Sequence, residues 1–171
     1  MIANRNNTRI RRPRGFTLVE ILIVVIILGI LAAIVIPQFT NASNDARKSN
    51  LVSQLQTLRS QIELYKLQHK DKIPPLITGG SSAWDVFTKY TDSDGNPSAV
   101  KTSTCAYGPY VQHAPSNPLS AAATATTIGG DPSTSPGWVY DETTGKLAAT
   151  GSDSTKYFDE STGNDSSSPT W

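Results

Sequence analysis

Two hydrophobic patterns follow each other in the N-terminal part of the chain. Residues 16–36 read FTLVEILIVVIILGILAAIVI, and every position from Ile21 to Ile36 is apolar or glycine. As a helix this stretch would be about 32 Å long, which matches the hydrocarbon core of a bilayer. The core helix of a soluble protein would carry a polar stripe, and none follows Glu20. The pattern therefore predicts a membrane-spanning helix.

The second pattern begins after Pro37 and is amphipathic. Its apolar residues recur at helical spacing, at Leu51, Leu55, Leu58, Ile62 and Tyr65. The pair Pro74–Pro75 ends the pattern, because proline disfavours helix at the preceding residue. We expect one long helix over 16–72 that is kinked or loosened at Pro37. Two separate helices broken at Pro37 are the alternative.

The rest of the chain predicts short elements joined by turns. Ser81 or Ser82 can cap a short helix over 83–90, and its apolar side chains would pack on the long helix. These side chains are Trp84, Val86 and Phe87.

Turn signals divide the C-terminal part. Residues 91–97 read TDSDGNP, which is typical of a turn, and 137–149 favour a β-hairpin around a glycine-containing loop. The stretch 120–135 is rich in Ala, Thr, Ser and Gly and is expected to be a loop. Residues 151–171 are rich in Ser, Asp, Thr and Gly, which predicts a flexible acidic tail.

The distribution of charged residues also divides the chain into an N-terminal leader and a later part. The 171 residues carry 15 basic and 14 acidic side chains, but the segment before Phe16 has only basic ones. These are Arg5, Arg9, Arg11, Arg12 and Arg14. Basic residues before a membrane span keep that end in the cytoplasm, so the later part would lie across the membrane. Residues 73–171 contain four lysines and ten acids, which argues against nucleic-acid binding.

Three simpler interpretations compete for the N-terminal segment. A secretory signal peptide is disfavoured because the apolar run is long and no A-x-A site follows it. A plain signal anchor fits the length but gives no reason for Glu20, which would cost about 2.5–3.5 kcal/mol at the centre of a span unless paired. Snorkelling of Glu20 to the near interface lowers that cost and still gives no reason for a glutamate.

A short motif before the apolar run carries a family resemblance. Residues 14–20 read RGFTLVE, and with the unbroken apolar run they resemble the class III signal of the type IV pilin superfamily. That superfamily includes type IV pilins and the pseudopilins of type II secretion, and many members have proline at the position of Pro37. The resemblance implies an α+β, pilin-like fold. Its long N-terminal helix, transmembrane in the first half, would pack on a small antiparallel β-sheet domain.

The resemblance assigns roles to individual residues. Prepilin peptidase would cut between Gly15 and Phe16 and methylate the new amine of Phe16. Glu20 would pair with the Phe16 amine of a neighbouring subunit, and Pro37 would kink the helix. The implied divisions are a cleaved leader (1–15), a transmembrane and filament-core helix (16–37), its amphipathic continuation (38–72), a small β-containing domain (73–150) and the tail (151–171).

The C-terminal part resembles the family less specifically. Residues 107–110, 115–118, and 137–141 with 145–146 are similar to pieces of the G-type (major) pseudopilins. Cofactors are not expected, except that this resemblance implies calcium near a C-terminal loop; a solvated tail is the alternative. The candidate ligands are Asp153, Asp159, Glu160 and Asp165. The single cysteine, Cys105, excludes the C-terminal disulfide loop of many type IV pilins and favours a pseudopilin.

No catalytic motif is present: there is no G-x-S-x-G, H-E-x-x-H or P-loop. We therefore expect a structural subunit and not an enzyme. By resemblance it is a type II secretion pseudopilin, anchored once in the inner membrane with a cytoplasmic N-terminus and a periplasmic domain. Its partners would be prepilin peptidase, related subunits in a helical filament and the secretion machinery, and the filament would drive protein export. The alternatives are a type IV pilin for adhesion, motility or DNA uptake, and an anchored periplasmic enzyme or binding module.

Overall fold

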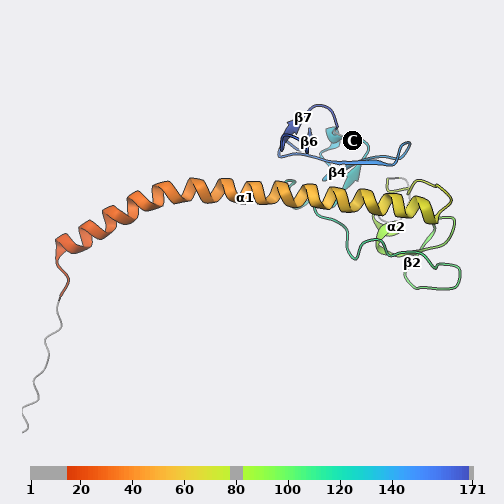
Figure 1. Cartoon of the computed structure of the whole chain (residues 1–171), viewed down its shortest axis with the longest axis horizontal. Helices are drawn as coiled ribbons and strands as arrows, with labels where there is room; N and C mark the ends of the chain where they lie inside the picture. The colour runs from red at the N-terminus through yellow and green to blue at the C-terminus, as the bar shows by residue number, and fades with distance from the viewer. Residues whose placement is uncertain (1–14, 78–82, 170–171) are drawn as a thin grey trace, which may run out of the picture. The chain divides into compact units, whose positions relative to one another are not determined.

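The computed structural model describes residues 15–77 and 83–169, and its longest element is the helix α1 (Leu18–Gln68; Figure 1). Pro37 lies inside α1. The prediction of one long helix is therefore confirmed over two helices broken at Pro37. The chain divides into two compact units, Met1–Ala42 and Ser43–Trp171. The arginines of the leader and the predicted caps at positions 81 and 82 lie outside the described residues.

Helix α1 ends four residues earlier than its sequence pattern predicts. Lys70 and Asp71 have φ values of 58° and 60°, in the left-handed region that cannot continue an α-helix. The Asp71 N–H donates to the Lys66 carbonyl (2.8 Å), a bond of the kind that closes helix C-termini. The helix therefore ends by a local reversal, before the two prolines act.

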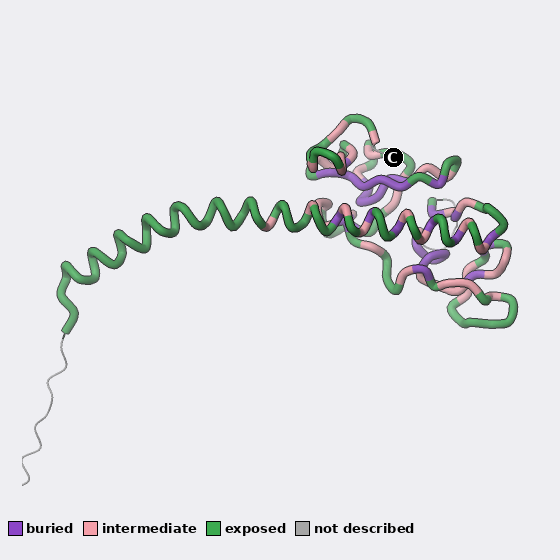
Figure 2. Tube along the Cα trace, in the orientation of Figure 1, coloured by how far each residue is buried: buried purple, intermediate pink, exposed green. Residues whose placement is uncertain are grey.

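The predicted apolar stripe is the buried face of α1. Its five residues, Leu51 to Tyr65, are the buried residues of the helix (Figure 2). They join one hydrophobic core with side chains from every later part of the chain. These include Leu76, Trp84, Val86, Phe87, Tyr110, Trp138, Tyr140, Leu147, Ala149 and Phe158.

The short helix α2 (Asp85–Thr88) is smaller than predicted, because Lys89 is already extended and β1 (Tyr90–Thr91) follows. Trp84 and Phe87 are buried in the core, as the sequence predicts. The turn after β1 leads to its antiparallel partner β2 (Pro97–Ser98).

Asp92 holds that turn together. Its Oδ1 accepts the N–H groups of Asp94 and Asn96, both at 2.9 Å. Hydrogen bonds from Asn96, chiefly that of its side-chain amide, lower the pKa of Asp92. Residues 92–96 therefore form the turn that the sequence predicts over 91–97, and its two end residues pair as strands.

The central sheet has three strands in the order β3–β4–β5. The predicted hairpin is β4 (Trp138–Asp141) and β5 (Lys146–Ala149), paired antiparallel with Asp141 opposite Lys146. Strand β3 (Ile128–Gly129) pairs parallel to β4 and is followed by a 3₁₀ turn at Pro132–Thr134. The expectation of a plain loop over 120–135 missed this strand. A two-residue strand has no sequence pattern of its own and forms only because it pairs with β4.

Asp141 closes the β4–β5 turn. Its Oδ1 accepts from the Thr143 N–H at 2.8 Å, and its Oδ2 accepts from the Thr144 hydroxyl at 2.7 Å. These bonds, with that of Thr144 foremost, lower the pKa of Asp141 to about 2. The Asp141 carboxylate that closes the turn therefore stays ionised at neutral pH.

The C-terminal segment differs from the expected flexible tail. It forms an antiparallel hairpin, β6 (Tyr157–Asp159) and β7 (Asn164–Ser166). Phe158 of β6 is buried in the common core, and Thr150 forms a bridge to Tyr157. One buried aromatic side chain and a following Asp-capped turn order a segment whose average composition is that of a disordered chain.

Truncating a stripe residue tests the core. We expect Leu55→Ala to lower the free energy of unfolding by about 2–5 kcal/mol, because it removes a fully buried side chain and leaves a cavity. Leu67→Ala on the same helix is the matched control, since Leu67 is 79% exposed and its loss should change stability by no more than about 0.5 kcal/mol. Denaturant unfolding of the full chain in detergent micelles, followed by tryptophan fluorescence, measures both. Equal effects of the two substitutions would contradict this core.

Candidate functional site

The start of α1 is set by Thr17. The Thr17 hydroxyl accepts the Glu20 N–H at 3.2 Å, and its carbonyl accepts the Ile21 N–H at 3.3 Å. Thr17 therefore caps the helix, in a T-x-x-E sequence that is typical of a capping box. Glu20 falls in the first helical turn, where the helix dipole favours a negative charge.

The peptide bond between Gly15 and Phe16 lies just before this cap, in backbone that is not helical. The Phe16 side chain is 77% exposed, and a Cβ built on Gly15 would meet no atom within 4 Å. Glu20 is exposed too and has no ion pair within residues 15–77 and 83–169. The three predicted site residues thus lie within about one helical turn of one another, open to another molecule.

The apolar stretch that follows has no cover. Every residue from 15 to 42 is exposed, and large apolar side chains such as Ile23, Ile27 and Leu31 are about half exposed. In the described part of the chain, α1 is the helix whose length and composition would let it cross a membrane. An apolar surface of this kind requires lipid or other helices around it.

Pro37 lies near the end of this stretch. It has no backbone N–H, so the carbonyl four residues before it loses its usual helical donor. The Thr40 hydroxyl supplies an extra bond nearby, donating to the Ile36 carbonyl at 3.1 Å. The predicted kink at Pro37 stays a prediction.

In the second unit, Arg59 joins the helix to two other elements. Its Nε and Nη2 donate to the Leu147 carbonyl of β5 at 3.0 and 2.8 Å. Its Nη1 and Nη2 donate to the two carboxylate oxygens of Glu160 at 3.1 and 2.6 Å. We call this set of contacts the Arg59 junction.

His69 ends the buried stripe. Its Nδ1 lies 2.8 Å from the Tyr65 carbonyl, and its Nε2 lies 3.0 Å from the Thr91 hydroxyl. Because a carbonyl can only accept, Nδ1 carries the proton, and Nε2 can accept from the hydroxyl. The ring stacks on Tyr65 at a centroid distance of 3.9 Å, and burial of Tyr65 raises its pKa to about 12. Both ring nitrogens of this histidine therefore have partners within the core.

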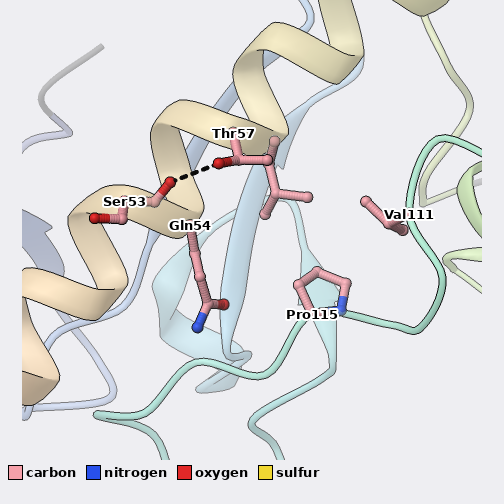
Figure 3. A pocket seen from close by; sticks show the side chains of 6 residues that line it. Ser53, Gln54, Thr57, Val111 and Pro115 are labelled. Carbon is pink, nitrogen blue, oxygen red and sulfur yellow. Dashed lines mark hydrogen bonds between the residues drawn. The ribbon is translucent and has the colours of Figure 1, made fainter.

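A cleft of about 260 Å³ opens between α1 and the segment that carries Val111 and Pro115 (Figure 3). Its helix wall carries polar side chains, and the opposite wall is apolar. The lining residues are Ser53, Gln54, Thr57, Leu58, Val111 and Pro115. The Thr57 hydroxyl is occupied in donating to the Ser53 carbonyl at 2.9 Å. Among the described residues, none that lines the cleft is charged or titratable.

Sequence reasoning missed three of these roles. The T-x-x-E spacing signals the Thr17 cap. Arg59 lies four residues after Leu55 and three before Ile62, which places it beside the buried stripe and signals a partner in the domain. His69 lies four residues beyond Tyr65 and continues the stripe by the same rule.

Comparison with known families and proteins points to the N-terminal segment. Residues 10–36 match the prokaryotic N-terminal methylation motif. The chain is 46% identical over 59 residues to the type II secretion system core protein G of Dickeya chrysanthemi, covering 34% of this chain and 39% of that protein. The Klebsiella pneumoniae protein of the same name is 41% identical over 59 residues, covering 34% and 42%. The match thus spans about two-fifths of the length of these relatives.

A pilus protein matches over a longer stretch. The type IV narrow pilus major component PilA5 of Thermus thermophilus is 32% identical over 87 residues, covering 48% of this chain and 75% of that protein. No solved structure matches the chain. These relatives are named as components of a secretion system or a pilus, and none of the three is named as an enzyme.

Proposed function

Because this chain belongs to the type IV pilin superfamily, we propose that it is a type II secretion pseudopilin, cut by prepilin peptidase and assembled into a periplasmic filament that drives protein export. At the coarser level, the chain is a pilin-like structural subunit and not an enzyme. The observation that supports the proposal best is the uncovered apolar helix directly after an accessible Gly15–Phe16 bond.

The two surfaces of α1 suit a subunit that leaves the membrane for a filament. From residue 18 to 42 all sides of the helix are exposed, so the same surface can face lipid first and identical helices later. From Leu51 to Tyr65 one face is buried in the protein's own domain. A filament core of first halves with domains outside would use both surfaces.

Glu20 supplies the charge that such an assembly requires. Cleavage before Phe16 would create an ammonium group close to an exposed carboxylate with no ion pair in the described chain. In a low-dielectric bundle, unpaired charges are costly and opposite charges attract strongly. Pairing Glu20 with the Phe16 amine of a neighbour would neutralise both and fix the axial register of the helices.

The charge pattern supports a membrane topology for the proposed pseudopilin. The chain is expected to be inserted once in the inner membrane, with the basic leader in the cytoplasm and the second unit in the periplasm. Prepilin peptidase, related subunits and the assembly machinery of the inner membrane are the proposed partners.

A type IV pilin is the second candidate function. The longer match to the narrow pilus component, which covers 75% of that protein, favours it. The matches to the core protein G, of higher identity and supported by the lone Cys105, favour a pseudopilin.

Processing can be measured directly. We expect the mature chain to begin at an N-methylated Phe16, and mass spectrometry of the N-terminal peptide from the native host will show it. Gly15→Val should abolish cleavage, since a branched side chain would stand beside the bond to be cut. Gly29→Val is the matched control, because Gly29 has equally open space inside the helix, and this variant should be cleaved normally. An intact leader in cells with active prepilin peptidase would contradict the proposal.

Glu20 is tested by neutralising it. Glu20→Gln should still be inserted and cleaved, but the yield of filaments should fall at least about tenfold, because one lost charge pair worth about 1.4 kcal/mol changes an equilibrium tenfold. Glu63→Gln removes an exposed i,i+3 partner of Lys66 and is the matched control with normal assembly. Filaments sheared from the cells are quantified against total subunit. Normal assembly of Glu20→Gln would count against the pairing.

A gene deletion distinguishes the two candidate functions. If the chain is a pseudopilin, its loss should leave secreted enzymes in the periplasm and leave surface pili unchanged. The periplasmic and medium fractions and electron microscopy of the cell surface measure the two effects. Lost pili with normal secretion would favour the pilin alternative, and plasmid complementation is the control.

A further inference from the structure

The Arg59 junction brings together the oxygen ligands that a hard cation prefers. A backbone carbonyl from Leu147 and both carboxylate oxygens of Glu160 converge on one point beside α1. Calcium sites are built from such oxygens, and six to eight are typical. Here the positive group at their centre is the guanidinium of Arg59, which belongs to the chain itself.

The remaining acidic residues of the hairpin region do not fit a calcium site. Asp165 accepts the N–H groups of Ser152 and Asp153, both at 2.9 Å, so positive ends of dipoles already point at its oxygens. Among residues 15–77 and 83–169, no three acidic, histidine or cysteine side chains are grouped so that they could hold a metal.

The other two candidate ligands are occupied as well. Asp153 accepts from Thr155 and forms an ion pair with Lys156. Asp159 accepts from the Ser161 N–H at 2.8 Å and from the Thr162 hydroxyl at 2.9 Å. The calcium that the family resemblance implies near a C-terminal loop therefore does not suit these residues.

We propose that the guanidinium of Arg59 takes the place of a structural cation and fastens the C-terminal hairpin, so that β6–β7 needs no calcium. The fork of a guanidinium suits this role, because it serves a carbonyl and a carboxylate at once with fixed geometry. The side chains of Arg59 and Glu160 are 31% and 19% exposed, so the pair is partly shielded from water.

The Arg59 junction fastens the β6–β7 hairpin to α1. It holds the residue that follows β6 to the helix, and Phe158 two positions earlier is buried in the core. In the same turn, a Cβ on Gly163 would lie 3.6 Å from Cδ of Lys48, so a second point of the β6–β7 turn lies against α1. Without Arg59, the Leu147 carbonyl and the Glu160 carboxylate would each lose their charged donor.

Hydrogen exchange on the full chain in detergent micelles tests the proposal. In the wild type, amide protection of residues 157–166 should be the same in millimolar calcium and in excess EDTA. Arg59→Gln should lower that protection about 5- to 30-fold, the range that corresponds to 1–2 kcal/mol. Lys66→Gln breaks the ion pair with the exposed Glu63 on the same helix and is the matched control with unchanged protection.

Two further variants keep the test decisive if Arg59→Gln does not fold. Arg59→Lys keeps the charge but loses the fork, and Glu160→Gln keeps the shape but loses the charge; each should lower protection of the hairpin while the β4–β5 amides stay protected. Two results would overturn the proposal. One is calcium-dependent protection of 157–166 in the wild type that is lost in Glu160→Gln. The other is protection in Arg59→Gln and Arg59→Lys equal to that in Lys66→Gln.

Discussion

The second unit depends on the burial of one face of α1. Leu51 to Tyr65 share one hydrophobic core with α2, with β4 and β5 of the central sheet and with β6 of the C-terminal hairpin. Those sheets have two or three short strands each, and sheets of that size are not stable without a hydrophobic face to cover. The domain is therefore organised by the helix, and a change in the stripe affects distant strands that share no hydrogen bond with it.

The same helix carries the opposite property at its other end. From Ile21 to Ile36 its surface is apolar all round, and the described chain leaves it uncovered. One element thus has a half that requires its own domain and a half that requires other molecules. In the proposed pathway the N-terminal half is covered first by a bilayer and then by a bundle of like helices, while the C-terminal half stays packed on its own domain. No change of fold is required.

The local signals of the sequence predicted the parts that depend on local spacing. The stripe follows from the helical period, and the β4–β5 hairpin follows from its turn residues. The hairpin β6–β7 could not be predicted from composition, because Phe158 and the Arg59 junction outweigh many polar residues. Strand β3 depends on β4 ten residues later, and no local pattern records that pairing. For the site, Gly15, Phe16 and Glu20 form one local motif, whereas the proposed partner of Glu20 would belong to another subunit.

The Thr17 cap has an electrostatic consequence for the mature chain. A cut before Phe16 would leave one residue ahead of the cap, so the new ammonium would stand beside the positive end of the helix dipole. Two positive charges of different origin would then meet at the tip of an apolar rod. Such a tip would attract carboxylates, whether the Glu20 of the same subunit or that of a neighbouring one. The geometry of the helix start would thus favour association of the processed subunit with other subunits through electrostatic attraction.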